Sequence, residues 1–163
     1  MTLELRPVQD EELQLFFDLL NDETLAVHTG TIPHPIDLQW TRDRLAQKRA
    51  GEKAGTLVDR GLYLDGVMVG NAGWFTEDGE VEIAYAIHRD YRGQGLATKA
   101  AQLVLDMLVT SGHKDPIYAV YFADNPGSGR VLEKLGFRRV GKLMGTGASR
   151  VGEHAQVKMV WDG

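Results

Sequence analysis

The segment DYRGQGLATKA (residues 90–100) decides how the rest of the chain is interpreted. Two glycines, Gly93 and Gly95, follow an arginine and precede an amphipathic run that predicts a helix from about Gly95 to Thr110. A helix N-terminus presents unpaired N–H groups and a partial positive charge. Glycines at this point let the backbone approach a ligand closely, because no Cβ stands in the way. The segment therefore predicts an anion site, most often for phosphate, on the amides of residues 93–98.

Spacing separates this segment from two well-known phosphate-binding loops. The sixth residue counted from Gly93 is Thr98, whereas the loop G-x-x-x-x-G-K-[ST] needs a glycine there. The dinucleotide fingerprint G-x-G-x-x-G/A fails at the same residue. A tight strand-to-helix turn that binds no ligand is the alternative interpretation.

A third loop fits. The run Arg92-Gly93-Gln94-Gly95-Leu96-Ala97 matches [RQ]-x-x-G-x-[GA], the pyrophosphate loop of the GNAT-fold N-acetyltransferases. Downstream, NPGSGRVLEKLGF (residues 125–137) resembles the N-x-x-S-x-R-V-L-E-K-L-G-F segment of the ribosomal-protein N-acetyltransferase-like (RimJ/RimL-type) branch. The resemblance spans roughly residues 56–140. It implies the GNAT fold and acetyl-CoA as the co-substrate, and it leaves the acceptor open.

The hydrophobic periods on either side of this segment predict an α/β (α+β) fold in one domain, residues 1–163. Two Asp-Gly pairs, at residues 65–66 and 78–79, predict hairpins, because these residues tolerate positive φ. Together with the strand-helix-strand crossover, they indicate a mixed, mostly antiparallel central sheet with helices on both faces, in the order β-α-α-β-β-β-α-β-α-β-β. The expected strands cover residues 2–7, 56–64, 67–76, 80–88, 116–122, 137–144 and 154–161. The expected helices cover residues 10–21 (capped by Asp10, with Leu13, Phe16, Phe17 and Leu20 inward), 38–50 (ending at Gly51), 95–110 and 128–135.

Composition excludes several classes of function. The 163 residues carry 18 Lys and Arg against 23 Asp and Glu, a net charge of −5, which argues against nucleic-acid binding as the main role. The absence of cysteine removes disulfides and thiolate catalysis, and the histidines lack metal-ligand spacing, so we expect no metal. No secretory signal or apolar run of about 20 residues is present, so we expect no membrane contact and a cytoplasmic location. A homodimer is left open.

The resemblance also implies which residues bind acetyl-CoA. The amides of residues 93–98 would hold its pyrophosphate, with Arg92 as a cation and Arg89, Lys99 and Lys134 as weaker candidates. A backbone N–H near Ile87 or His88 would bind the thioester carbonyl, and Asn125 would hold the pantetheine arm unless it only shapes the Asn-Pro turn. The predicted cofactor-binding residues are Ile87, His88, Arg92, Gly93, Gln94, Gly95, Leu96, Ala97, Thr98, Asn125 and Ser128.

Attack of an amine on a thioester needs a base for the amine and an acid for the departing thiolate. Glu82 is the expected base, because in the strand 80–88 it shares a face with small residues, and the family often places its base there. The alternative is an ordinary solvent-facing strand residue. His88, at the end of the same strand, is a weaker candidate than Glu82. The tyrosine that many members of the fold use as the acid is replaced by Leu132, which leaves Ser128 as the acid or as a helix N-cap.

These features predict an N-acetyltransferase that acts on a primary amine, either a protein N-terminus or a small molecule. The acceptor side is expected around VHTGTIPHPIDLQW (residues 27–40), where His28, His34 and Trp40 are candidate contacts together with Trp74. Because the tyrosine is missing, a non-catalytic acyl-CoA-binding module or sensor is the alternative function. A plain nucleotide-binding domain is a third and weaker interpretation.

Overall fold

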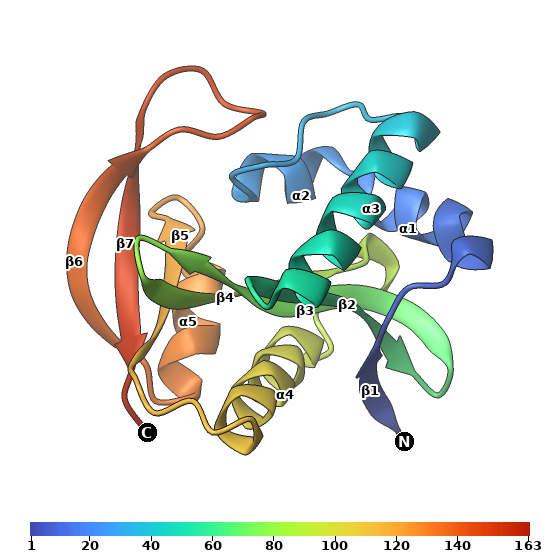
Figure 1. Ribbon diagram of the computed structural model, residues 1–163. Helices are drawn as coiled ribbons and strands as arrows, with labels where there is room; N and C mark the ends of the chain where they lie inside the picture. Colours follow the sequence, from blue (N-terminus) through green and yellow to red (C-terminus); the bar gives the residue numbers. More distant parts are fainter.

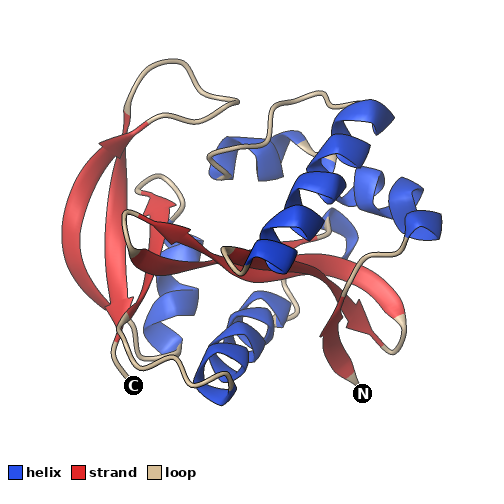
Figure 2. Cartoon of the chain, in the orientation of Figure 1, coloured by secondary structure: helices blue, strands red, loops and turns tan.

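The computed structural model describes residues 1–163 and contains one seven-stranded sheet in the order β1-β2-β3-β4-β5-β7-β6. The strands are β1 (Leu3–Arg6), β2 (Leu57–Leu64), β3 (Val67–Glu77), β4 (Glu80–Ile87), β5 (Ile117–Phe122), β6 (Arg138–Gly145) and β7 (His154–Trp161). All neighbouring pairs are antiparallel except β4 and β5. The mixed, mostly antiparallel sheet expected from the sequence is confirmed (Figures 1 and 2).

The two hairpins turn where the Asp-Gly pairs predict. Asp65 and Asp78 both have φ of +50°, and Gly66 and Gly79 follow with φ of +84° and +80°. Positive φ at both central residues matches the right-handed twist of the flanking strands, so the loops stay at two residues. The Asp78-Gly79 turn thus sets the register of β3 with β4, whereas a β-bulge between Leu62 and Tyr63 shifts the register of β2 with β3.

The helices are α1 (Leu13–Leu20), α2 (Glu23–His28), α3 (Leu38–Ala54), α4 (Leu96–Thr110) and α5 (Pro126–Lys134), with short 3-10 turns η1 (Asp10–Glu12) and η2 (Arg89–Tyr91). Helix α3 passes the expected end at Gly51 and stops at Gly55, which adopts φ of +79°. Gly51 serves another purpose. A Cβ there would lie 2.5 Å from Cγ of Leu57, so glycine lets the helix pass close to β2.

The N-terminal helices differ most from the prediction. Asp10 does not cap the first helix, because Gln9 forms a capping box with Glu12 and a 3-10 turn precedes α1. Helix α2 was not expected. The Asp22 side chain begins it by accepting hydrogen bonds from the N–H groups of Thr24 and Leu25. Aspartate at an N-cap position was the sequence signal that could have located this helix.

Two buried clusters hold helices on opposite faces of the sheet (Figure 1). One lies under α4 and α5 and includes Leu62, Ile83, Val104 and Leu132. The other joins α1, α2 and α3 to the opposite face, and Phe16, Leu20, Leu25 and Leu45 belong to it. None of the helices has both the length and the apolar character needed to span a membrane.

Candidate active site

The sheet splits between β4 and β5. These parallel strands pair only at Val81 with Ile117 and at Glu82 with Tyr118, after which they diverge. Figure 1 shows β5, β6 and β7 turned steeply away from β2, β3 and β4. Beyond Glu82, the β5 side of β4 therefore has no partner strand. We call this opening the wedge.

Backbone N–H groups of β4 point into the wedge. The His88 N–H donates to the Val69 carbonyl at 2.8 Å, and the β3–β4 ladder pairs Gly70 with Ile87. Antiparallel ladders alternate, so the N–H groups of Tyr85 and Ile87 point away from β3. A backbone donor at Ile87 thus suits the predicted carbonyl contact. The prediction for His88 is wrong, because Val69 already occupies its N–H.

The N-terminus of α4 is exposed beside the end of β4. Gly93 and Gly95 have φ of +80° and +76°, and a Cβ at either position would project into open space. Gly95 is the N-cap residue, and no side chain caps the helix. The first N–H groups, at Leu96, Ala97 and Thr98, therefore have no side-chain acceptor. Gln94 is exposed between the two glycines. This cradle fits a diphosphate group.

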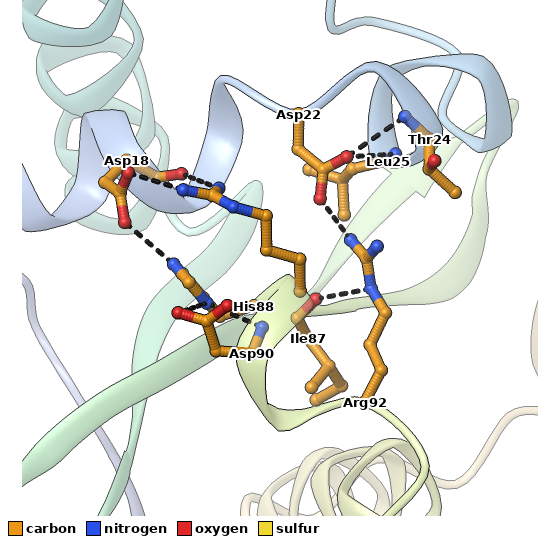
Figure 3. Close-up of polar contacts among 9 residues, drawn as sticks. Asp18, Asp22, Thr24, Leu25, Ile87, His88, Asp90 and Arg92 are labelled. Carbon is orange, nitrogen blue, oxygen red and sulfur yellow. Dashed lines mark hydrogen bonds and ion pairs between the residues drawn. The ribbon is translucent and has the colours of Figure 1, made fainter.

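Arg92 has a different role from the one predicted. Its Nη2 pairs with Oδ2 of the buried Asp22 at 2.5 Å, and its Nε donates to the Ile87 carbonyl at 3.1 Å (Figure 3). The guanidinium thus joins α2 to the end of β4. It does not stand free to neutralise a diphosphate. Burial alone would raise the pKa of Asp22, but the hydrogen bond and charge of Arg92 outweigh it, so the pKa lies below its ordinary value.

His88 and Arg89 are also held by the N-terminal helices. The Asp90 N–H donates to Nδ1 of His88, so the ring proton sits on Nε2, which donates to Asp18 at 2.8 Å (Figure 3). Arg89 pairs with the same carboxylate at 2.8 Å. Both His88 ring nitrogens are occupied, which makes His88 a structural residue. Arg89 likewise has an acidic partner already, whereas Lys99 and Lys134 are exposed.

On the α4 and α5 side of the wedge, Ser128 contacts a tyrosine. Ser128 is the third residue of α5, so it is not the N-cap, and its Oγ lies 3.0 Å from the Tyr85 hydroxyl. Burial raises the pKa of Tyr85, and the Ser128 hydrogen bond only partly opposes this. Leu132 is buried in the core. Asn125 is the N-cap of α5, but its side chain caps no amide and is free for another partner.

The sheet face opposite α4 and α5 is open at the centre of the sheet. Ala84, in the middle of β4, is exposed, and Glu82 lies two residues away on the same face, partly buried. Burial raises the pKa of Glu82, Glu77 raises it further, and Lys158 opposes them. Along the strand, Glu82 is about 10 Å from Tyr85 and about 17 Å from Ile87. A proton reaching Glu82 from the wedge would have to travel through water.

Of the predicted acceptor residues, Trp40 adjoins this face, where the Arg44 guanidinium lies over its ring. His34 is exposed, His28 ends α2, and Trp40 packs partly against the cluster beneath α3. Trp74 packs on the α4 side, away from Ala84, so its prediction is wrong. The sequence analysis missed the polar residues of α3, β2 and β3 on this face. Their chain separation hid them, since only folding brings those elements together. They are Arg44, Lys48, Asp59 and Asn71.

Comparisons with known proteins bear on the family and the fold of the chain. The model of the acetyltransferase (GNAT) domain family matches residues 2–138. Among curated proteins, no sequence match was found.

Solved structures show the same fold at low sequence identity. RimL, a ribosomal L7/L12 alpha-N-protein acetyltransferase in complex with coenzyme A, is 16% identical with a TM-score of 0.88, covering 99% of this chain and 94% of that one. Mycobacterium smegmatis RimJ with CoA-disulfide is 23% identical with a TM-score of 0.79, covering 97% and 81%. Vibrio cholerae spermidine N-acetyltransferase with CoA and spermine is 16% identical with a TM-score of 0.81, covering 98% and 94%.

Proposed function

Because this chain belongs to the acetyltransferase (GNAT) domain family, we propose that it transfers the acetyl group of acetyl-CoA to a primary amine. The observation that carries the proposal is the junction of an uncapped helix N-terminus with a split sheet. The α4 cradle suits a diphosphate, and the wedge beside it exposes the N–H groups of Tyr85 and Ile87. RimL, RimJ and the spermidine enzyme, which share this fold, are bound to coenzyme A or its disulfide.

The cradle holds the co-substrate mainly through backbone groups. Arg92 and Arg89 already have carboxylate partners, so the charge of a diphosphate falls on the amides of residues 93–98 and on the positive end of α4. Asn125, whose side chain caps nothing, would bind an amide of the pantetheine arm. Backbone amides and the positive end of a helix therefore let an acidic protein bind an anionic co-substrate.

The chemical steps then follow from the residues around the wedge. The amine nitrogen attacks the thioester carbonyl carbon, and the carbonyl oxygen gains negative charge, which the N–H of Ile87 or Tyr85 stabilises. The amine loses a proton through water to Glu82, whose raised pKa makes it a better base than an ordinary carboxylate. As the C–S bond breaks, the Ser128 hydroxyl passes its proton to the departing thiolate while the Tyr85 phenol reprotonates Ser128. The proton that Glu82 took up returns through water to Tyr85, which restores both groups for the next turnover.

The test combines binding with turnover. Calorimetry measures the affinity for acetyl-CoA, and thiol release is followed across a panel of amines and peptides. Binding accompanied by amine-dependent thiol release supports the proposal, and absence of acetyl-CoA binding at high micromolar concentration overturns it. ATP or NAD competing as well as coenzyme A would instead support a nucleotide-binding domain.

A non-catalytic acyl-CoA sensor is the second candidate, favoured by the core position of Leu132 where many relatives of the fold carry tyrosine. It predicts tight binding without turnover. The contact between Ser128 and Tyr85 favours the enzyme, because it supplies a hydroxyl pair on the cofactor side. The cytoplasmic location and the homodimer stay predictions, to be tested by fractionation and size-exclusion chromatography.

A further inference from the structure

The open face at Ala84 has a floor of small residues. In the β3–β4 ladder Gly73 pairs with Ala84, and Asn71 pairs with Ala86, so these side chains share the face toward α3. In the β2–β3 ladder Asp59 pairs with Gly73. The floor over Gly73 and Ala84 thus carries no side chain larger than a methyl group, although it lies on central strands. Polar side chains surround it.

Two cations of α3 stand beside this floor. Arg44 and Lys48 are one helical turn apart, and Lys48 Nζ lies 3.7 Å from Oδ2 of Asp59. The side chains of Lys48 and Asp59 are only 21% and 14% exposed. Arg44 donates from Nη1 to the Thr31 hydroxyl at 3.1 Å and lies over the Trp40 ring. Two positive charges therefore face one carboxylate.

Two buried polar atoms near Asp59 have no partner. Asn71 donates from Nδ2 to Oδ1 of Asp59 at 2.9 Å, but its Oδ1 accepts nothing although Asn71 is only 8% exposed. The Nε of Arg44 is also buried without an acceptor. Buried polar groups are nearly always paired in folded proteins. A ligand that carries an anion and an N–H would satisfy both orphaned atoms and the excess positive charge.

Asn71 connects the polar cluster, which consists of Arg44, Lys48, Asp59 and Asn71, to the wedge. Directly opposed residues of an antiparallel pair have Cβ atoms about 5 Å apart, so the Asn71 side chain begins next to Ala86. Ala86 lies between Tyr85 and Ile87, whose N–H groups enter the wedge. A ligand bound at the cluster therefore lies next to the proposed reaction centre.

We propose that Arg44, Lys48 and Asn71 select acceptors whose primary amine has a carboxylate close by. This inference rests on the proposed function and names its substrate class. The carboxylate of the acetyl-accepting molecule pairs with Arg44 and Lys48. An N–H group of the same molecule donates a hydrogen bond to Oδ1 of Asn71. A polyamine is disfavoured, because its added positive charges meet the uncompensated cation of the cluster. An acidic amino acid and a peptide that begins with an acidic residue carry the same recognition chemistry.

The experiment compares acceptors on the full chain with acetyl-CoA present. Its arms are free glutamate, an amidated peptide with N-terminal glutamate, the same peptide with N-terminal glutamine, and spermidine. We expect kcat/KM for at least one carboxylate-bearing acceptor to exceed kcat/KM for the glutamine peptide and for spermidine by about tenfold to about a hundredfold. This range corresponds to the free energy of a charge-assisted hydrogen bond. The first two arms separate a free amino acid from a peptide as the source. Equal kcat/KM values across all arms overturn the inference.

Variants assign the preference to the cluster. Arg44→Gln should raise KM for the preferred arm at least about tenfold with little change in kcat, and Arg44→Lys should recover part of it. Arg42→Gln is the matched control, since Arg42 is exposed on the same helix and bonds only Gln39. An equal loss on every acceptor from Arg44→Gln contradicts the inference.

Failure of the proposed function is distinguishable from failure of the inference. If acetyl-CoA does not bind, the function fails, and calorimetry with glutamate, with the glutamate peptide and with spermidine still tests the cluster. Binding of glutamate or of the glutamate peptide that Arg44→Gln abolishes supports the site, and binding of neither overturns it. If acetyl-CoA binds and amines turn over without a carboxylate preference, only the inference fails.

Discussion

Asp22→Ala tests the contact that joins α2 to the end of β4. The Asp22 carboxylate accepts hydrogen bonds from the Thr24 and Leu25 amides at 3.0 and 3.4 Å, and it pairs with Arg92. Losing the N-cap costs about 1 kcal/mol. Breaking a buried ion pair costs about 3–5 kcal/mol. The Arg92 side chain is 36% exposed and is partly rehydrated, so we reduce that loss to about 1–2 kcal/mol.

The expected total is a loss of about 2–3 kcal/mol in the free energy of unfolding. For a chain of this size, that corresponds to a fall in Tm of roughly 4–12 °C. Urea unfolding followed by tryptophan fluorescence measures the free energy, and a thermal scan measures Tm. The loss should fade in acid, because a carboxylate with a lowered folded pKa stabilises the fold above its unfolded pKa and ceases to do so as pH falls through the folded value.

Asp37→Ala is the matched control. Asp37 caps α3 by accepting from the Trp40 N–H at 2.8 Å, but it is exposed and has no ion pair, so its loss should cost about 1 kcal/mol. The double variant Asp22→Ala with Arg92→Leu should be more stable than Asp22→Ala alone, since no unpaired cation remains. If Asp22→Ala and Asp37→Ala cost the same, the Arg92 pair contributes nothing and the argument for a structural role of Arg92 is refuted.

The remaining predictions concern the cofactor and the chemistry. Gly95→Val should weaken acetyl-CoA binding at least about tenfold while the protein stays folded, because its Cβ would occupy the open cradle and φ of +76° strains the turn by about 1–2 kcal/mol. Unchanged affinity by calorimetry would disprove the phosphate assignment. Glu82→Gln should lower kcat most between the raised pKa of Glu82 and the pKa of the amine, and less above it, in a pH–rate profile from about pH 6 to about pH 10. A loss that does not vary with pH would indicate a structural role. Ser128→Ala should lower kcat by about a hundredfold with little change in acetyl-CoA affinity, and Tyr85→Phe should lower it less, as stopped-flow thiol release would measure. Equal rates in Ser128→Ala and wild type would remove Ser128 as the acid.

Much of the fold could be predicted because its signals are local. The Asp-Gly hairpins, the helix from Leu96 to Thr110 and the closing strands all follow from φ preferences and hydrophobic period, and each lies within two residues of its predicted bounds. Helix α3 ran beyond its predicted end because Gly51 is used for a close helix–strand approach, which a stop signal in the sequence cannot distinguish from a helix end.

The features of the candidate site likewise divide into local properties, which the sequence predicts, and tertiary ones, which it does not. The glycine cradle before α4 is a local property, since a positive φ and a helix start are fixed by neighbouring residues. The partner of a charged side chain is a tertiary property. Arg92 looked like a phosphate ligand until folding placed Asp22, 70 residues away, against it.

The sequence by itself determined the family resemblance, the α/β order and the location of the anion cradle, because those depend on backbone preferences a few residues apart. Only the tertiary structure decided which cations are already paired, that His88 is held by Asp18, and that Ser128 contacts Tyr85. It also brought Arg44, Lys48, Asp59 and Asn71 together from three elements. The reason is physical, since hydrogen bonds and ion pairs act over a few ångströms of space regardless of the separation along the chain.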